Sequence, residues 1–189
     1  MEHSSIHFLG ISGSLRKGSF NTMLLNVALA SVPEGVATET GDISDLPLYN
    51  ADLDMEPYPP SVIRLKDQIR KADALVIATP EYNYSMPGVL KNAIDWVSRP
   101  PKDSPFFNKP FAILSASTGI LGGARAQYHL RQSAVFLNMH PLNRPEVIVA
   151  NAAAKFDADG NFKDEPGKEL IRKQMTALVE WTKLLQGKS

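Results

Sequence analysis

Hydroxyl and cationic side chains gather in residues 13–22, and no acidic residue lies among them. This segment connects an apolar run to a helical pattern, so it would lie at the start of a helix. The free N–H groups of a helix N-terminus, with about half a positive charge, suit a phosphate. Further donors would come from the side chains of Ser14, Arg16, Ser19, Asn21 and Thr22. The segment therefore predicts a phosphate site.

The same segment matches neither of two common phosphate-binding motifs. It lacks the Gly-Lys-Ser/Thr ending of a P-loop, and it lacks the Gly-x-Gly-x-x-Gly spacing of dinucleotide-binding domains. A solvated polar turn in which Asn21 caps the following helix is therefore an open alternative.

Residues 79–88 form a second candidate loop, which follows the most continuous apolar run of the chain. The two prolines of this loop, Pro80 and Pro87, restrict its backbone. Tyr82 or Tyr84 would face a flat ring, and backbone N–H groups would reach the polar edge of that ring. An ordinary packed loop, with the tyrosines covering the edge of the core, is the alternative.

Residues 115–123 form a third loop that contains three glycines, Gly119, Gly122 and Gly123. Glycine allows positive φ and close approach of the backbone to a ligand. A flexible connection to the next helix would explain this loop alone. Taken together, the three loops describe a site for a flat ring that a chain joins to one phosphate. Flavin mononucleotide (FMN) has that shape.

The elements that would position these loops alternate along the chain. Apolar runs predict strands over residues 6–11, 36–40, 74–78, 111–116 and 147–150. Helical spacing predicts helices over residues 21–31, 61–71, 89–97, 124–138 and 168–185. This pattern predicts one α/β domain over residues 1–189, a doubly wound five-stranded parallel sheet with helices on both faces. The flavodoxin-like strand order 2-1-3-4-5 is the economical choice, and ligands of such folds bind at the carboxyl ends of the strands.

Composition narrows the class of function. The 189 residues carry 20 lysines and arginines and 20 aspartates and glutamates, which argues against general binding to nucleic acid or to an anionic membrane. The absence of cysteine excludes disulfides, thiolate catalysis and cysteine-ligated metals. No apolar run approaches the roughly 20 residues that span a bilayer, and the first residues do not look like a signal peptide. We therefore expect a cytoplasmic protein.

Two histidines invite a metal hypothesis. His129 and His140 both lack a close partner at ligand spacing, so we expect no metal site. A phosphate-ester hydrolase that uses residues 13–22 would be a further alternative. We disfavour it because the chain offers no cysteine nucleophile.

Three motifs, in order, resemble the NADPH-dependent FMN reductase family, in its chromate- and quinone-reductase branch. The first is Gly-Ser-Leu-Arg-Lys-Gly-Ser-Phe-Asn over residues 13–21. The second is Pro-Glu-Tyr-Asn-Tyr-Ser-Met-Pro-Gly over residues 80–88, continued by residues 90–96. The third is Gly-Gly-Ala-Arg over residues 122–125, continued by residues 127–132. The resemblance covers roughly residues 6–146.

The resemblance implies a flavodoxin-like fold that binds FMN through these motifs. The phosphate would be held by Ser14, Arg16, Ser19, Asn21 and Thr22, and Phe20 belongs to the same cofactor-binding motif. The ribityl chain and ring would be lined by Pro80, Glu81, Tyr82, Asn83 and Tyr84. The pyrimidine side of the ring would be approached by Ser117, Thr118 and Gly119. Gly122 and Gly123 would support that last loop.

The resemblance also implies an activity. NADH or NADPH would reduce FMN by hydride transfer, and the electrons would pass to quinones, chromate-like metal oxyanions, azo compounds or free flavin in ping-pong order. Because the flavin carries the chemistry, no protein residue need act as acid, base or nucleophile. The backbone near Asn83, and that of residues 117–119, would contact the polar edges of the ring.

Two further expectations concern partners and the main alternative. Members of the family assemble, which implies a homodimer or homotetramer, and Arg125, Tyr128 and Glu146 are candidates for the interface. The alternatives for these residues are guidance of an anionic acceptor to the flavin, or an exposed helix with ordinary ion pairs. An electron carrier, or a flavin-binding module without a substrate of its own, is the alternative from another class. Such carriers are typically strongly acidic, so the zero net charge and the cationic first loop favour the enzyme.

Overall fold

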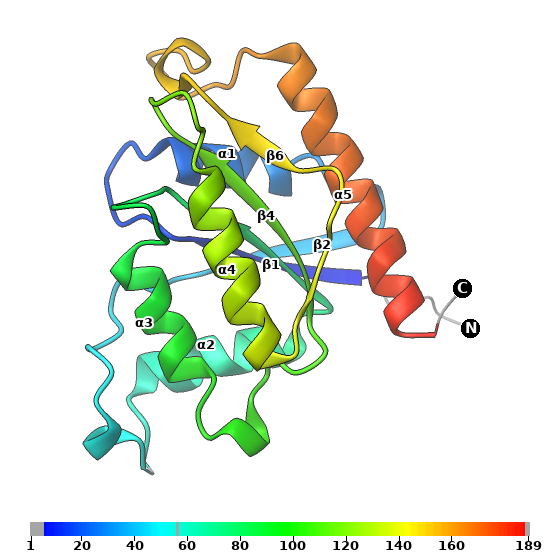
Figure 1. Cartoon of the computed structure of the whole chain (residues 1–189). Helices are drawn as coiled ribbons and strands as arrows, with labels where there is room; N and C mark the ends of the chain where they lie inside the picture. Colours follow the sequence, from blue (N-terminus) through cyan, green and yellow to red (C-terminus); the bar gives the residue numbers. More distant parts are fainter. Residues whose placement is uncertain (1–5, 56, 188–189) are drawn as a thin grey trace.

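Six strands lie parallel in one sheet, in a computed structural model that describes residues 6–55 and 57–187 (Figure 1). They are β1 (Ile6–Ser12), β2 (Val36–Gly41), β3 (Ala74–Ala78), β4 (Pro110–Ala116), β5 (His140–Pro141) and β6 (Val147–Val149). The order is β2-β1-β3-β4, and both β5 and β6 pair with β4 on its far side. The flavodoxin-like order 2-1-3-4-5 predicted from the sequence is confirmed.

The fifth position of the sheet differs from the single strand that we predicted over residues 147–150. Two short strands occupy it, and the intervening chain contains Pro145, which has no N–H to donate to β4. Two buried side-chain amides span the interruption. Gln174 donates to the carbonyls of Ile113 and Pro145, and Gln127 donates to the Val147 carbonyl. Side chains thus connect this segment to the rest of the sheet where the backbone ladder is broken.

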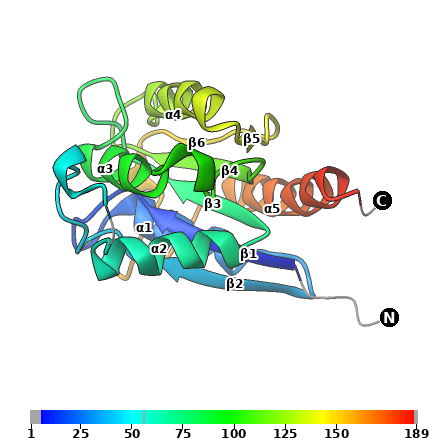
Figure 2. The same cartoon turned by 90° about the horizontal axis from the view of Figure 1, so that it is seen from below.

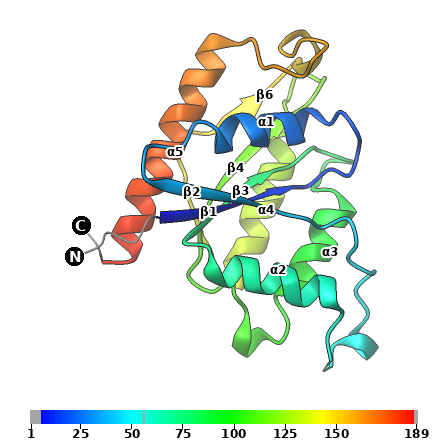
Figure 3. The same ribbon diagram turned by 180° about the vertical axis from the view of Figure 1, so that it is seen from behind.

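Five helices cover the two faces of the sheet (Figures 2 and 3). They are α1 (Phe20–Leu29), α2 (Pro60–Lys71), α3 (Gly88–Val97), α4 (Ala124–Leu137) and α5 (Glu165–Leu185). Helices α1 and α5 pack on the face that presents Phe8, Val76 and Leu114. Helices α2, α3 and α4 pack on the opposite face, against neighbours such as Leu9 and Ile77. Both faces of the central strands are buried, as the unbroken apolar runs predicted.

The observed helix boundaries correct two of our predictions. Helix α1 begins at Phe20 because the Ser19 side chain caps it, accepting from the Asn21 backbone N–H, so the prediction that Asn21 is the cap was wrong. Helix α5 begins at Glu165, earlier than residue 168, because the Asp164 side chain accepts from the Gly167 N–H. Short 3₁₀ turns occur at Ala51–Leu53, Pro101–Asp103 and Ala152–Ala154.

Strands β1, β3 and β4 end at the same edge of the sheet, and β4 runs two residues past the ends of the other two. Ser12 pairs with Ala78, and Ala78 pairs with Leu114, so the loops after these three strands leave the same edge of the sheet. This register brings together the three loops that the sequence singles out. No helix of the described chain is long and apolar enough to cross a membrane.

Candidate functional site

The loop after β1 is held tightly at its start. The Gly13 N–H donates to the Ala78 carbonyl at 2.8 Å. A Cβ at Gly13 would lie 3.1 Å from a Leu90 methyl and 3.3 Å from the Thr79 hydroxyl, so a larger residue would push the loop away from β3. The loop then turns at Ser14, whose hydroxyl accepts from the Arg16 N–H at 3.4 Å.

Asn21 fastens the first turn of α1 to the end of β4. Its side-chain N–H donates to the Ala116 carbonyl at 2.9 Å, and its side-chain oxygen accepts from the Ala116 N–H at 2.9 Å. The side chain is 3% exposed. Asn21 therefore lies at the site, but both its polar atoms already bind Ala116, 95 residues away in sequence.

The loop after β3 forms a tight hairpin turn over residues 82–85. Tyr82 and Ser85 exchange backbone hydrogen bonds of 2.9 and 3.0 Å. The two residues between them, Asn83 and Tyr84, have φ of 50° and 69°. Two central residues with positive φ are the type I′ pattern of two-residue hairpins. The turn projects Tyr84, which is 67% exposed, away from the core.

The loop after β4 depends on two glycines for its path. Gly122 and Gly123 have φ of 60° and 91°, in the left-handed region that favours glycine. A Cβ at Gly122 would lie 2.6 Å from a methyl group of Ile148, and one at Gly123 would lie 2.8 Å from the Ser115 Cβ. These glycines bring the loop against β4 and β6. The close approach of this loop to a ligand stays a prediction.

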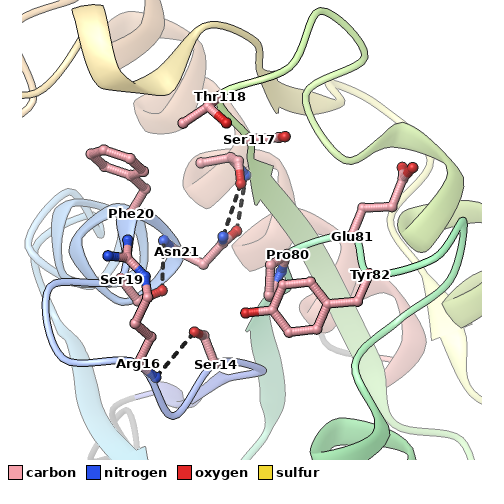
Figure 4. Close-up of a pocket in the computed structure, with 11 residues that line it drawn as sticks. Ser14, Arg16, Ser19, Phe20, Asn21, Pro80, Glu81, Tyr82, Ser117 and Thr118 are labelled. Atoms are coloured by element: carbon pink, nitrogen blue, oxygen red, sulfur yellow. Dashed lines mark hydrogen bonds between the residues drawn. The ribbon is translucent and has the colours of Figure 1, made fainter.

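Two adjoining cavities lie between the three loops. The first cavity, of about 390 Å³, is lined by Ser14, Arg16, Ser19, Phe20, Asn21, Pro80, Glu81, Tyr82, Ala116, Ser117 and Thr118 (Figure 4). The second cavity, of about 450 Å³, is lined by Glu81, Asn83, Tyr84, Ser117, Gly119, Ile120, Leu121, Gly123 and Arg125. Glu81 and Ser117 belong to both. The two cavities therefore form one elongated site at the carboxyl edge of the sheet.

The first cavity presents hydroxyls and a cation beside the N-terminus of α1. Ser14, Arg16 and Ser19 lie on one side of it, opposite Pro80 and Tyr82 (Figure 4). The Arg16 guanidinium lies 5.6 Å from the centre of the Phe20 ring. The one acidic residue in the lining is Glu81, and its carboxylate points away from Ser14 and Ser19 in Figure 4. This donor set suits a phosphate.

The Glu81 carboxylate binds Arg125 instead. It accepts from the Arg125 backbone N–H at 3.1 Å and from the Nε–H at 2.5 Å, and it forms an ion pair with Nη2. Hydrogen bonding to Glu81 raises the pKa of Arg125 above its ordinary value. The guanidinium carbon of Arg125 also lies 3.5 Å from the centre of the Tyr84 ring. Glu81, Arg125 and Tyr84 thus form one contact group across two loops.

The structure brings together the residues that the sequence assigned to cofactor binding, with one exception. Of these, Ser14, Arg16, Ser19, Phe20, Asn21, Pro80, Glu81, Tyr82, Ser117 and Thr118 line the first cavity. Asn83, Tyr84 and Gly119 line the second cavity. Thr22 lies outside both linings, and its hydroxyl is 2.8 Å from the Ser12 hydroxyl within the β1–α1 connection.

Sequence reasoning missed some lining residues. Ala116, Ile120 and Leu121 were not assigned to the site, and only the position of Ile120 and Leu121 beside Gly119 could have indicated them. Arg125 was assigned to a subunit interface rather than to a cavity. Arg125 and Glu81 are 44 residues apart in the sequence, and no local sequence pattern predicts their contact.

The residues weighed for metal and interface roles have other contacts. His129 Nδ1 lies 2.9 Å from the Ser85 hydroxyl, and His140 Nε2 lies 3.2 Å from the Asn108 side-chain oxygen. Within the described residues, no group of three or more His, Cys, Asp or Glu could hold a metal ion. Glu146 lies 3.9 Å from Arg131, and Tyr128 is 53% exposed on α4.

Known proteins match this chain over nearly its whole length. The family model described as NADPH-dependent FMN reductase matches residues 6–154. The chain belongs to the NADPH-dependent FMN reductase family. It is therefore an oxidoreductase that works with FMN and NAD(P)H, and the alternatives of a hydrolase or a carrier without a substrate are not supported.

The names of individual relatives agree with the activity of this family. An NAD(P)H-dependent FMN reductase of Pseudomonas aeruginosa is 57% identical over 182 residues, which cover 96% of this chain and 98% of that protein. A quinone reductase of Escherichia coli K12 is 46% identical, over 89% of this chain and 91% of that protein. The solved structure of FerB, a flavoenzyme NAD(P)H:(acceptor) oxidoreductase of Paracoccus denitrificans, has a TM-score of 0.86 and 36% identity, covering 95% of this chain and 98% of that chain.

Proposed function

We propose that this family member is a quinone reductase that holds FMN across the two adjoining cavities. The phosphate would lie in the first cavity and the ring toward the second. One observation carries this orientation: the hydroxyls, the cation and the helix N-terminus gather at the first cavity, and the acid that lines it is turned toward Arg125. A phosphate placed there meets donors and no free carboxylate.

The residues of the chain would bind and orient, rather than react. Ser14, Arg16 and Ser19 would hold the phosphate. The backbone of the Tyr82–Ser85 turn and that of residues 117–119 would hold the polar edges of the ring. FMN, when bound, supplies the group that accepts and donates hydride. Tyr84, Ile120 and Leu121 would border the space for the second substrate, because they line the second cavity and are exposed.

The substrates are proposed from the relatives and from the shape of the site. Three of the relatives, from Escherichia coli, Arabidopsis thaliana and Solanum tuberosum, are named as quinone reductases or quinone oxidoreductases. We extend to this chain the reduction of quinones, and further of chromate-like metal oxyanions, azo compounds and free flavin. Because one space beside the ring would serve both substrates, oxidised nicotinamide cofactor would leave before the acceptor binds, in ping-pong order.

A spectroscopic and kinetic experiment tests this function. Purified protein mixed with FMN should retain an oxidised-flavin absorbance after gel filtration, and NADPH should bleach it. Initial rates at several quinone concentrations should give parallel double-reciprocal lines against NADPH. Protein that holds no flavin, or that oxidises no NADPH or NADH with a quinone, would disprove the proposal. Intersecting lines would disprove the ping-pong order alone.

Arg16 offers a direct test of the phosphate position. Replacing a charge-assisted hydrogen bond by alanine should weaken FMN binding by about 1–3 kcal/mol. Titration of flavin fluorescence with wild-type and Arg16→Ala protein measures the difference. Lys17→Ala is the matched control, since Lys17 is a neighbouring cation outside the lining of both cavities. An unchanged affinity in Arg16→Ala would remove Arg16 from the phosphate site.

Assembly and location complete the proposal. We infer a homodimer or homotetramer in the cytoplasm, in which each chain forms one domain. Of the three interface candidates, Tyr128 is the most exposed. Arg125 and Glu146 have ion-pair partners within the chain, so contacts to another copy would have to add to these pairs. Light scattering at micromolar concentration should give a mass above the 20.7 kDa of one chain.

A further inference from the structure

Glu81 occupies the boundary between the two cavities. Its side chain is 7% exposed, although it lines both. A carboxylate removed this far from water is costly unless it is paired and hydrogen bonded. Arg125 provides three contacts to it, through the backbone N–H, Nε and Nη2. The placement of the pair suggests a role other than binding a ligand through its charge.

The backbone contact ties Glu81 to the first turn of α4. Arg125 is the second residue of that helix, and its N–H has no partner within the helix at this position. Gly123, the cap residue, has no side chain to accept a hydrogen bond. Glu81 therefore supplies the missing acceptor from the loop after β3, 44 residues away.

The guanidinium contact ties Arg125 to the hairpin turn. Tyr84 has φ of 69°, a backbone conformation that L side chains adopt at a cost. The Arg125 guanidinium lies over the Tyr84 ring at 3.5 Å, close enough for a cation–π contact. A planar guanidinium can face a ring while its edge binds a carboxylate, whereas a lysine ammonium cannot. Arg125 thus connects Glu81 and Tyr84.

We propose that Glu81 is a positioning residue that joins the loops after β3 and β4 into one wall of the second cavity through Arg125. This inference rests on the proposed function, because the wall matters only where a substrate meets the flavin ring. Tyr84 and residues 119–121 border that space, whereas Ser14 and Ser19 line the first cavity, where the phosphate would lie. Loosening the wall should therefore weaken binding of NADPH and quinone more than binding of FMN.

Steady-state kinetics of two variants and their combination test the role. In Glu81→Gln an amide N–H₂ faces the Arg125 donors, and in Arg125→Lys the Nε–H and the planar group are lost. We expect KM for NADPH and for quinone to rise about tenfold in each, with kcat within about threefold of wild type. The double variant should be no worse than the poorer single one, because both remove the same connection.

A more exposed ion pair outside the site, also between an arginine and a carboxylate, provides the control. Arg64 donates to both carboxylate oxygens of Asp45, at 2.7 and 3.0 Å, and neither residue lines a cavity of the site. Asp45→Asn should leave KM and kcat unchanged. KM values of Glu81→Gln within twofold of wild type would overturn the proposal, as would two single effects that multiply in the double variant.

Hydrogen–deuterium exchange separates this proposal from the proposed function. In protein without flavin, Glu81→Gln should speed exchange of the Ser85 amide, which closes the turn, and of the Arg125 amide. Unchanged exchange there would overturn the role of Glu81 whatever the enzyme does. Wild-type protein that binds no FMN would instead overturn the proposed function. Should Glu81→Gln fail to fold, Arg125→Lys carries the kinetic measurement and the exchange of the Ser85 amide, because its own backbone N–H can still donate to Glu81.

Discussion

The first and second cavities share Glu81 and Ser117 but are built in different ways. The first takes five of its eleven lining residues from one continuous stretch, residues 14–21, which turns into a helix capped by its own Ser19. The second is lined by segments that meet only in the folded chain, such as Glu81 with Arg125, and the path of its glycine loop depends on the packing of Gly122 against Ile148. A site can thus combine an end set by local sequence with an end set by tertiary packing.

The difference has energetic consequences. Substitutions in the first cavity remove hydrogen-bond donors from a loop that is crowded at Gly13 but has open space at Gly18, where an added Cβ would meet nothing within 4 Å. Substitutions in the second cavity disturb backbone packed against neighbouring strands. Comparable changes at the two ends should therefore differ in their cost to folding.

Gly122→Ala should have the largest effect. Its Cβ would lie 2.6 Å from the Ile148 methyl and 3.0 Å from the backbone of Val149 and Ala150, at a φ of 60°. Left-handed strain and overpacking together should lower the free energy of unfolding by about 2–4 kcal/mol. Urea unfolding followed by circular dichroism measures the loss.

Gly18→Ala is the matched comparison in the first cavity's loop. Its φ of 68° carries the same kind of strain, but the space around it is open. The expected loss is about 1 kcal/mol. Equal losses in the two variants would show that packing does not distinguish the two ends of the site.

Asn21→Ala comes next, and it tests a long-range contact of the first cavity, the one between Asn21 and Ala116. The substitution removes two hydrogen bonds and leaves the buried N–H and carbonyl of Ala116 without those partners. We expect the free energy of unfolding to fall by about 2 kcal/mol. Asn26→Ala, at an exposed position of the same helix, controls for helix propensity and should change stability little. Similar values for both would mean that the link to Ala116 is not stabilising.

These contrasts explain which features the sequence could predict. The positions of the strands and helices and the loop of Ser14 and Arg16 follow from local patterns, namely apolar runs, helical spacing and turn residues. The strand order was chosen as the economical one for five strands, because local patterns do not specify which strands pair. The cap of α1 was assigned to Asn21 rather than Ser19 because both are good cap residues two positions apart. Local sequence does not show that the Asn21 side chain hydrogen bonds to the backbone of Ala116, 95 residues away.

The second cavity and the far edge of the sheet were harder to predict from the sequence. Both depend on contacts between residues that are far apart along the chain. In the sequence, Glu81 is an isolated acid and Arg125 an isolated cation on a helix. Only the fold brings the two side chains together. Residues 140–149 form two short strands separated by a segment that contains Pro145, and Gln127 and Gln174 supply hydrogen bonds across this interruption. Such compensation by distant side chains has no signature in the segment itself.

A hairpin near the C-terminus supports the first cavity from outside. The Phe20 ring, which lines that cavity, packs on Phe156 at 5.3 Å between centroids, and Phe156 packs on Phe162 at 4.9 Å. Phe156 and Phe162 pair across the hairpin, whose turn is closed by the Asp157 carboxylate. The Asp157 carboxylate accepts hydrogen bonds from the backbone N–H and the side-chain amide of Asn161, and its Oδ2 lies 3.1 Å from the Lys163 Nζ.

Asp157→Asn should give the smallest effect, and one that depends on pH. Hydrogen bonds from Asn161, aided by Lys163, lower the pKa of Asp157 from 3.8 to about 2 in the folded protein. The carboxylate therefore stabilises the fold fully above the unfolded pKa, and this contribution disappears as pH falls through the folded value. The difference in unfolding free energy between wild type and Asp157→Asn should be constant near neutral pH and shrink between pH 3.8 and about 2. Asp159→Asn, which removes a carboxylate without a hydrogen bond or ion pair among the described residues, should show no such narrowing. A difference between wild type and Asp157→Asn that stays constant down to pH 2 would contradict the lowered pKa of Asp157, and with it the hydrogen bonds from Asn161 that lower it.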